Sequence, residues 1–267
     1  MKLNTIRKDN IMKNHKNYIT ILVATFLIGV AAFCGFKIYH HYTQAQIQEE
    51  VFDEIAKSVE ETKTNQEEET PPYSTVQDIL AEYGELYLQN ADMVGWIRIA
   101  NTTINYPVMH TPRSPNYYLN RNFHKAYSSL GVPYIQENCN ILESDNLIIY
   151  GHHIKGKKMF GALEDYKSKT FYEKNKIIRF DTLSERGEYE IIAVFTQTAY
   201  SKDGYRYYDF VNAEDESAFT DYIDKCKELS LYDTGVSATY GDKLITLSTC
   251  EYSSNNGRLV VVAKKVG

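Results

Sequence analysis

The strongest constraint on the fold lies near the end of the chain, where two strand-like segments flank a short polar turn. Lys243–Thr249 alternates Leu, Ile and Thr, and Arg258–Val266 is almost continuously apolar. Between them, Ser253–Gly257 has the composition of a turn. An antiparallel hairpin would bring Cys250 and Arg258 within a few residues of directly opposite each other. Opposed residues in such a ladder have Cα atoms roughly 4.5 to 5.5 Å apart.

A thiol and a guanidinium at one strand end form a candidate site for covalent chemistry. The thiolate is a nucleophile, and a fixed cation stabilises a developing anion. A lone cysteine is more often a small buried hydrophobe, and Arg258 alone would be an ordinary surface cation. The position of Cys250 at the end of its strand favours the catalytic interpretation.

A second segment adds an imidazole to this chemistry. The predicted strand Asn146–Tyr150 is followed by Gly151, His152 and His153. An acyl transfer through a thiol needs a group that protonates the departing amine. Adjacent residues of an extended segment point to opposite sides, so only one of the two histidines can face Cys250. The residues alone do not decide which of the two histidines faces Cys250.

Together these motifs resemble the sortases, the cysteine transpeptidases of Gram-positive cell surfaces. The resemblance covers about residues 75–267 and rests on strand-Gly-His, on Thr-Leu-Ser-Thr-Cys and on Gly-Arg at the start of the next strand. Within the family the chain is similar to class B. The segments that carry this second resemblance are Val94–Ile99, Ile104–Val108, Asn116–Phe123 and a predicted helix at Ala213–Leu229.

The resemblance implies a mechanism and a set of partners. Cys250 would attack the carbonyl of a threonine in the C-terminal sorting signal of a secreted protein and form a thioacyl enzyme. His152, which directly follows the glycine, would serve as general acid and base, and Arg258 would stabilise the oxyanion. The acyl group would pass to an amine of a peptidoglycan precursor or cell-wall peptide. No cofactor is implied.

Residues beside the nucleophile are candidates for substrate binding. Ser248 and Thr249 precede Cys250, and Glu251 follows it. Tyr205 lies in a tyrosine-rich segment that also fits the edge of a groove. Turn and strand chemistry explains these four residues equally well.

Alternatives of two kinds compete with cell-wall anchoring: enzymes that use the same site with another acceptor, and a protein without catalysis. The same thioacyl intermediate given to water makes a thiol protease, and given to a protein lysine it makes a pilin-polymerising sortase. A surface binding module without catalysis is the third possibility. The joint presence of Cys250, His152 and Arg258 argues against that module.

The N-terminal region predicts attachment to a membrane. Tyr18–Phe36 is an uncharged, mostly apolar run, and about 20 helical residues cross a bilayer. Residues 1–17 contain five Lys or Arg and one acidic residue, which predicts a cytoplasmic tail. We expect residues 18–38 to be an uncleaved signal anchor, because the run exceeds a signal-peptide core and no clear cleavage site ends it. The remainder would lie outside the cell.

Residues 39–72 are predicted to form a helical stalk and an acidic linker. Gln44–Lys63 is charged, with one apolar residue every fourth position. This stripe would pack on the catalytic domain or on another copy of the chain, although a spacer is the simplest role. Thr64–Pro72 is acidic and ends in two prolines, which marks the boundary before a catalytic domain at residues 73–267.

The catalytic domain is predicted to be mainly β with added helices. Short strands at regular spacing favour a barrel or sandwich, and the family resemblance implies a closed barrel of about eight strands. A helix from about Tyr73 to Leu86 precedes the first strand. The expected strands are 95–100, 102–109, 132–135, 146–150, 176–181, 188–197, 243–249 and 258–266.

Cysteine usage, metal motifs and charge limit the other functions. Cys34 lies in the apolar run, Cys226 belongs to the apolar face of the predicted helix at 213–229, and Cys139 occupies a turn. No disulfide framework is apparent, although a Cys139–Cys226 bridge stays open. There is no metal-binding motif, and the net charge of −6 argues against a nucleic-acid partner.

Overall fold

The computed structural model describes residues 2–66, 79–198, 204–252 and 256–267. The chain divides into two compact units, residues 1–47 and 48–267. The first unit is part of the long helix α1 (Lys2–Gln66). Thr20–Tyr39 within it has a mean hydropathy of 2.2, and it is the one helical segment of the described chain that is long and apolar enough to cross a membrane.

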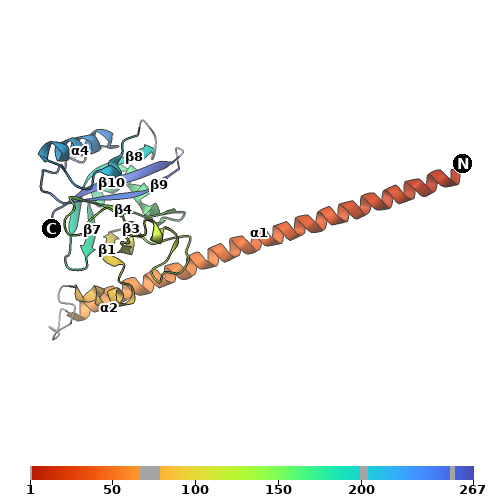
Figure 1. Ribbon diagram of the computed structural model, residues 1–267, viewed down its shortest axis with the longest axis horizontal. Coiled ribbons are helices and arrows are strands. Elements are labelled where there is room, and N and C mark those ends of the chain that lie inside the picture. The colour runs from red at the N-terminus through yellow and green to blue at the C-terminus, as the bar shows by residue number, and fades with distance from the viewer. Residues whose placement is uncertain (1, 67–78, 199–203, 253–255) are drawn as a thin grey trace. The chain divides into compact units, whose positions relative to one another are not determined.

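The second unit is built around a closed β-barrel, as the sequence predicts (Figure 1). Neighbouring strands follow the order β1-β2-β3-β4-β9-β10-β8-β7 and then return to β1. Two of the neighbouring pairs, β2–β3 and β4–β9, are parallel, and the others are antiparallel. The barrel strands are β1 (Met93–Ile99), β2 (Asn105–Met109), β3 (Tyr134–Ile135), β4 (Asn146–Tyr150), β7 (Ile177–Thr182), β8 (Glu188–Thr198), β9 (Leu244–Glu251) and β10 (Gly257–Lys265).

Short elements cover the barrel and fill its connections. A two-stranded sheet pairs β5 with β6. Helix α2 precedes β1, and the other helices after it lie between strands. Their bounds are α2 (Ala81–Gln89), η1 (Tyr117–Asn120), β5 (His153–Ile154), β6 (Lys158–Met159), η2 (Phe160–Lys167), α3 (Lys169–Lys174), η3 (Tyr207–Asp209) and α4 (Glu216–Leu229).

Helix α4 packs its apolar side on the outer face of β8 and β10 (Figure 1). Phe219, Ile223 and Cys226 are buried there, as their helical spacing predicts. The helix begins at Glu216 rather than at the expected Ala213, because the Asp215 side chain accepts a hydrogen bond from the Ala218 N–H at 2.8 Å and caps the first turn.

Other predicted boundaries were wrong for similar local reasons. The expected strand at 102–109 begins at Asn105, because Thr102 forms a turn: its hydroxyl donates to the Ile99 carbonyl and accepts from the Ile104 N–H. The strand at 132–135 is reduced to β3. The helix that was predicted to start near Tyr73 begins at Ala81 within the described residues, and positions 73–78 lie outside them.

The last part of α1 packs on the barrel. Phe52, Ile55 and Val59 are buried, and the Phe52 ring meets Tyr106 edge-on with centroids 5.3 Å apart. Gln48 donates a hydrogen bond to the Gly131 carbonyl at 2.8 Å. Of the roles that the apolar stripe left open, the structure therefore has the one in which the stripe packs on the catalytic domain.

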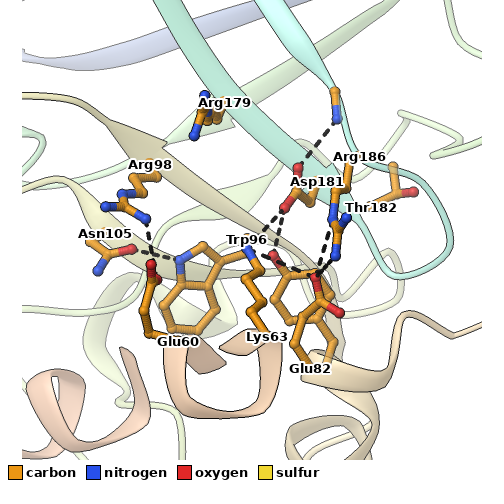
Figure 2. Close-up of polar contacts among 12 residues, drawn as sticks. Glu60, Lys63, Glu82, Trp96, Arg98, Asn105, Arg179, Asp181, Thr182 and Arg186 are labelled. Atoms are coloured by element: carbon orange, nitrogen blue, oxygen red, sulfur yellow. Dashed lines mark hydrogen bonds and ion pairs between the residues drawn. The ribbon is translucent and has the colours of Figure 1, made fainter. Parts of the chain in front are cut away.

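Buried charges hold the end of this helix (Figure 2). The ammonium of Lys63 lies 3.8 Å from a Glu82 oxygen and 3.9 Å from an Asp181 oxygen. Arg186 donates to Glu82 at 2.8 Å, and the Tyr83 hydroxyl donates to Asp181 at 2.6 Å. Because burial and Asp181 both disfavour the phenolate, the pKa of Tyr83 is raised far above its usual value.

The Cys139–Cys226 bridge is absent. Both residues are free and buried. Burial raises the pKa of Cys139 to about 11 and that of Cys226 to about 12, so both are neutral thiols at physiological pH.

Candidate active site

The hairpin of β9 and β10 sets the predicted nucleophile directly beside the predicted oxyanion donor. Cys250 and Arg258 are Cα partners in the antiparallel ladder, which confirms the expected opposition. Both side chains are partly exposed. One Arg258 nitrogen donates to its neighbour's carbonyl, that of Gly257, at 2.9 Å. The guanidinium has five N–H bonds, so others are left to donate to a substrate.

The parallel pairing of β4 with β9 brings the two histidines to the same strand end (Figure 1). Tyr150 is the Cα partner of Ser248, and the Gly151 N–H donates to the Ser248 carbonyl at 3.2 Å. Continuing this register by two residues predicts that His152 lies level with Cys250 and on the same face, because side chains alternate along extended segments.

The ring of His152 is held by backbone. Its Nε2 lies 2.7 Å from the Leu119 carbonyl oxygen. A carbonyl can only accept, so Nε2 carries a proton, and Nδ1 is the ring nitrogen left to exchange a proton with a substrate. No pattern in the sequence indicates this contact, because a backbone carbonyl 33 positions away leaves no residue-type signature.

The glycine before the histidines is required by packing. A Cβ at Gly151 would lie 2.5 Å from the Phe160 ring, far inside van der Waals contact. The Thr249 hydroxyl donates to the Gly151 carbonyl at 2.8 Å and ties the turn to β9. The Phe160 ring and the Thr249 hydroxyl therefore fix the backbone at Gly151, directly before His152.

A groove of about 550 Å³ leads to this strand end. Arg258 is on its wall, and Leu119, whose carbonyl holds His152, is also a lining residue. The other described lining residues are mostly polar or aromatic: Asn116, Tyr134, Gln136, Glu137, Asn138, Tyr150, Tyr207, Tyr208 and Asp209.

Hydrogen bonds fix the groove walls. Tyr134 donates to the Asn116 side chain at 2.8 Å, and Gln136 donates to the Tyr208 carbonyl at 2.9 Å. Asn116 belongs to a segment that carries the class B resemblance, but its place in the groove was not predicted. Asn116 directly precedes η1 and has a left-handed backbone, with φ of 61°.

The four predicted substrate-binding residues are not among the described lining residues of the groove. Ser248 is buried and exchanges a hydrogen bond of 2.7 Å with the Tyr207 hydroxyl. Thr249 is buried against Gly151. Glu251 is buried and paired with Lys167, and Tyr205 packs against the α4 cluster. Of the four, Ser248 contacts a residue that lines the groove, Tyr207.

Comparisons with known proteins agree with this arrangement. The sortase domain family matches residues 97–266. A curated relative, sortase B of Staphylococcus aureus, is 32% identical over 254 residues, which cover 93% of this chain and 97% of that protein.

Solved structures give the same result at the level of the fold. A Staphylococcus aureus sortase B–substrate complex superposes with a TM-score of 0.73 at 27% identity, over 84% of this chain and 98% of that one. A sortase B complexed with triglycine gives a TM-score of 0.71 at 28% identity, over 83% and 98% of the two chains.

A closed eight-stranded mixed barrel with a cysteine, an arginine and a glycine-histidine turn at one end defines the sortase class of cell-wall-anchoring transpeptidases. The chain belongs to the sortase family, and within it to class B.

Proposed function

We propose that this enzyme cleaves the C-terminal sorting signal of secreted proteins after a threonine, through a thioacyl intermediate on Cys250, and transfers the acyl group to a peptidoglycan amine. The observation that carries the proposal is the direct pairing of Cys250 with Arg258, which lies on the wall of the groove. His152 follows the neighbouring strand β4, and continuing its register predicts that His152 shares a face with Cys250.

Each residue has one task in this reaction. The Cys250 thiolate adds to the threonine carbonyl, and the Arg258 guanidinium donates hydrogen bonds to the oxyanion that forms. His152, an imidazolium while Cys250 is a thiolate, gives the proton on Nδ1 to the departing amine as the C–N bond breaks, and Nε2 keeps its proton on the Leu119 carbonyl. The incoming amine then adds to the thioester, loses a proton to His152 and expels the thiolate, so the enzyme returns to its starting state.

The groove supports a peptide as the first substrate. Aromatic rings and amide side chains line it, which suits an extended chain with alternating side chains and exposed peptide groups. A Staphylococcus aureus sortase B has been solved as a substrate complex, and a sortase B has been solved with triglycine, a peptide that carries a free amine. By analogy, both substrates would meet at Cys250.

The N-terminal helix would anchor the enzyme in the cell membrane. The apolar segment Thr20–Tyr39 has the length of a single span, and the five basic residues before it favour a cytoplasmic N-terminus. The barrel would then face the cell wall, where secreted cargo and peptidoglycan amines are both present.

Mass spectrometry of the detergent-solubilised chain tests the chemistry. The chain is incubated with a pool of Asn-Pro-x-Thr-x peptides, with and without triglycine. We expect a thioester on Cys250 that triglycine converts to a ligated peptide, and no adduct in Cys250→Ala. Hydrolysis alone would indicate a thiol protease, and the absence of any adduct with the thiol reduced would refute the proposal.

Rate measurements test the two supporting roles. Arg258→Ala should lower kcat/KM by ~10² to 10³, because it removes an oxyanion donor. Arg258→Lys, the matched control, keeps the charge without the planar fork and should recover only part of this loss. His152→Ala should abolish ligation. Full activity in either alanine variant would remove that residue from the mechanism.

A further inference from the structure

Ionisable side chains of three elements meet at the end of β9 that carries Cys250. They are His153 on β5, Glu164 and Lys167 on η2, and Glu251, which follows the nucleophile. The Glu251 side chain is only 3% exposed. The reaction proposed above uses none of these four side chains.

Contacts join these side chains into one chain. Lys167 Nζ lies 2.7 Å from Glu251 Oε1 and 3.0 Å from Glu164 Oε1. The other Glu164 oxygen is 3.7 Å from His153 Nε2. His153 Nδ1 lies 3.0 Å from the Cys250 carbonyl oxygen. The chain of contacts therefore begins and ends on two consecutive residues of β9.

Lys167 secures the Glu251 end of this chain. A buried carboxylate needs a partner, because leaving its charge unpaired in a protein interior is costly. Partial burial acts to lower the pKa of Lys167, but the hydrogen bonds to Glu251 and Glu164 outweigh it and raise the pKa above its ordinary value. Lys167 is therefore a permanent cation between two carboxylates.

The His153 ring makes a hydrogen bond where a backbone N–H would continue the ladder between the two strands. The Ser248 carbonyl receives the backbone N–H of Gly151 from the neighbouring chain segment. Two residues later, the Cys250 carbonyl receives the Nδ1–H of the His153 ring, because a carbonyl can only accept. The imidazole thus holds the peptide group of the nucleophile just beyond the end of β4.

Tyr252 fixes the ring from its other side. The Tyr252 hydroxyl donates to the His153 carbonyl at 3.2 Å, and the two rings lie edge to face with centroids 5.0 Å apart. The ring is therefore restrained by its own backbone and by Tyr252 while it binds the Cys250 carbonyl.

We infer that His153 is a positioning residue of the transpeptidation site: its ring, packed against Tyr252, fixes the peptide plane of Cys250 and thereby the direction of the sulfur. This inference rests on the proposed role of Cys250. Misplacement of a reacting atom by about 1 Å can cost ~10²-fold in rate, so loss of this contact should lower kcat and leave peptide binding in the groove unchanged.

Two substitutions of His153 distinguish a positioning role from a catalytic or purely structural one. His153→Leu removes both ring nitrogens. In His153→Asn the side-chain N–H₂ occupies the position of Nδ1 and can still donate to the Cys250 carbonyl, but it cannot reach Glu164. The control is His124→Leu, which replaces an exposed histidine in the β2–β3 connection.

Peptide cleavage by the full-length chain in detergent provides kcat and KM, and thermal unfolding provides stability. We expect His153→Leu to lower kcat by ~10 to 10²-fold with KM within about twofold, His153→Asn to recover most of kcat, and His124→Leu to match the unsubstituted chain. A purely structural role would lower the unfolding temperature of both His153 variants without separating their kcat values.

Three outcomes would overturn the inference. Equal kcat for the Leu and Asn variants would exclude a role for the Nδ1 donor. Complete loss of activity in both variants would make His153 the proton-transfer residue. A rise in KM without a change in kcat would place it in substrate binding. An inactive unsubstituted chain would instead refute the proposed function, so the two failures are distinguishable.

Discussion

Replacing Phe52 by alanine should destabilise the barrel, although this residue lies on the helix that continues from the apolar segment. The Phe52 side chain is 3% exposed and meets Tyr106 of β2. Truncating a buried phenylalanine costs ~3–5 kcal/mol. We expect about 3 kcal/mol, the lower end, because a helix at the barrel surface can shift to fill part of the cavity. For a unit of this size that lowers Tm by ~6 to 12 °C.

Urea and thermal unfolding of residues 48–267 measure this loss. The matched control is Lys57→Ala on the same helix, whose side chain is 76% exposed and pairs with Glu61 across one helical turn. It should change the free energy of unfolding by less than ~0.5 kcal/mol. Equal unfolding midpoints for the two variants would refute the packing of this helix on the barrel.

Three further predictions concern the interior of the unit. Iodoacetamide should leave Cys139 and Cys226 unmodified in the native chain at about pH 8, because burial raises the pKa of Cys139 to about 11 and that of Cys226 to about 12. Labelling of either thiol, detected by mass spectrometry, would contradict this. Tyr83→Phe should lower the free energy of unfolding by ~1.5–3 kcal/mol, because Asp181 loses a buried hydrogen bond, and an unchanged urea midpoint would count against it. Burial acts to raise the pKa of Asp92, but hydrogen bonds from Lys125 and Tyr118 outweigh it and lower the pKa. The ionised carboxylate therefore stabilises the fold above the unfolded-state pKa, and this stability is lost as pH falls through the lower folded-state pKa. Asp92→Asn should flatten the decline in Tm below about pH 4, and an equally steep decline in both chains would argue against this role.

The catalytic hairpin could be predicted because its information is local. Two apolar segments with a turn between them allow one compact pairing, and the pairing of Cys250 with Arg258 follows from it. The barrel and the core position of Cys226 were predicted from strand spacing, helical spacing and the family resemblance. These features depend on residues that are close in sequence or on motifs that are strongly patterned.

The supporting contacts could not be predicted, because they join distant residues through weakly patterned chemistry. The Leu119 carbonyl holds His152 from 33 positions away, and Lys167 reaches Glu251 across 84 positions. An acidic residue after the nucleophile is equally consistent with substrate binding and with a buried ion pair. Only the fold of η2 against β9 distinguishes these two interpretations for Glu251.

The hairpin register has a consequence for how such enzymes diversify. The ladder between β9 and β10 extends from Gly257–Glu251 to Lys264–Leu244, and a slip of one residue would turn every side chain to the opposite face. The strands, rather than the loop at 252–256, therefore determine which residue opposes Cys250. Descendants of this chain can gain or lose loop residues, and so acquire new recognition surfaces beside the reaction centre, without separating the reactive pair.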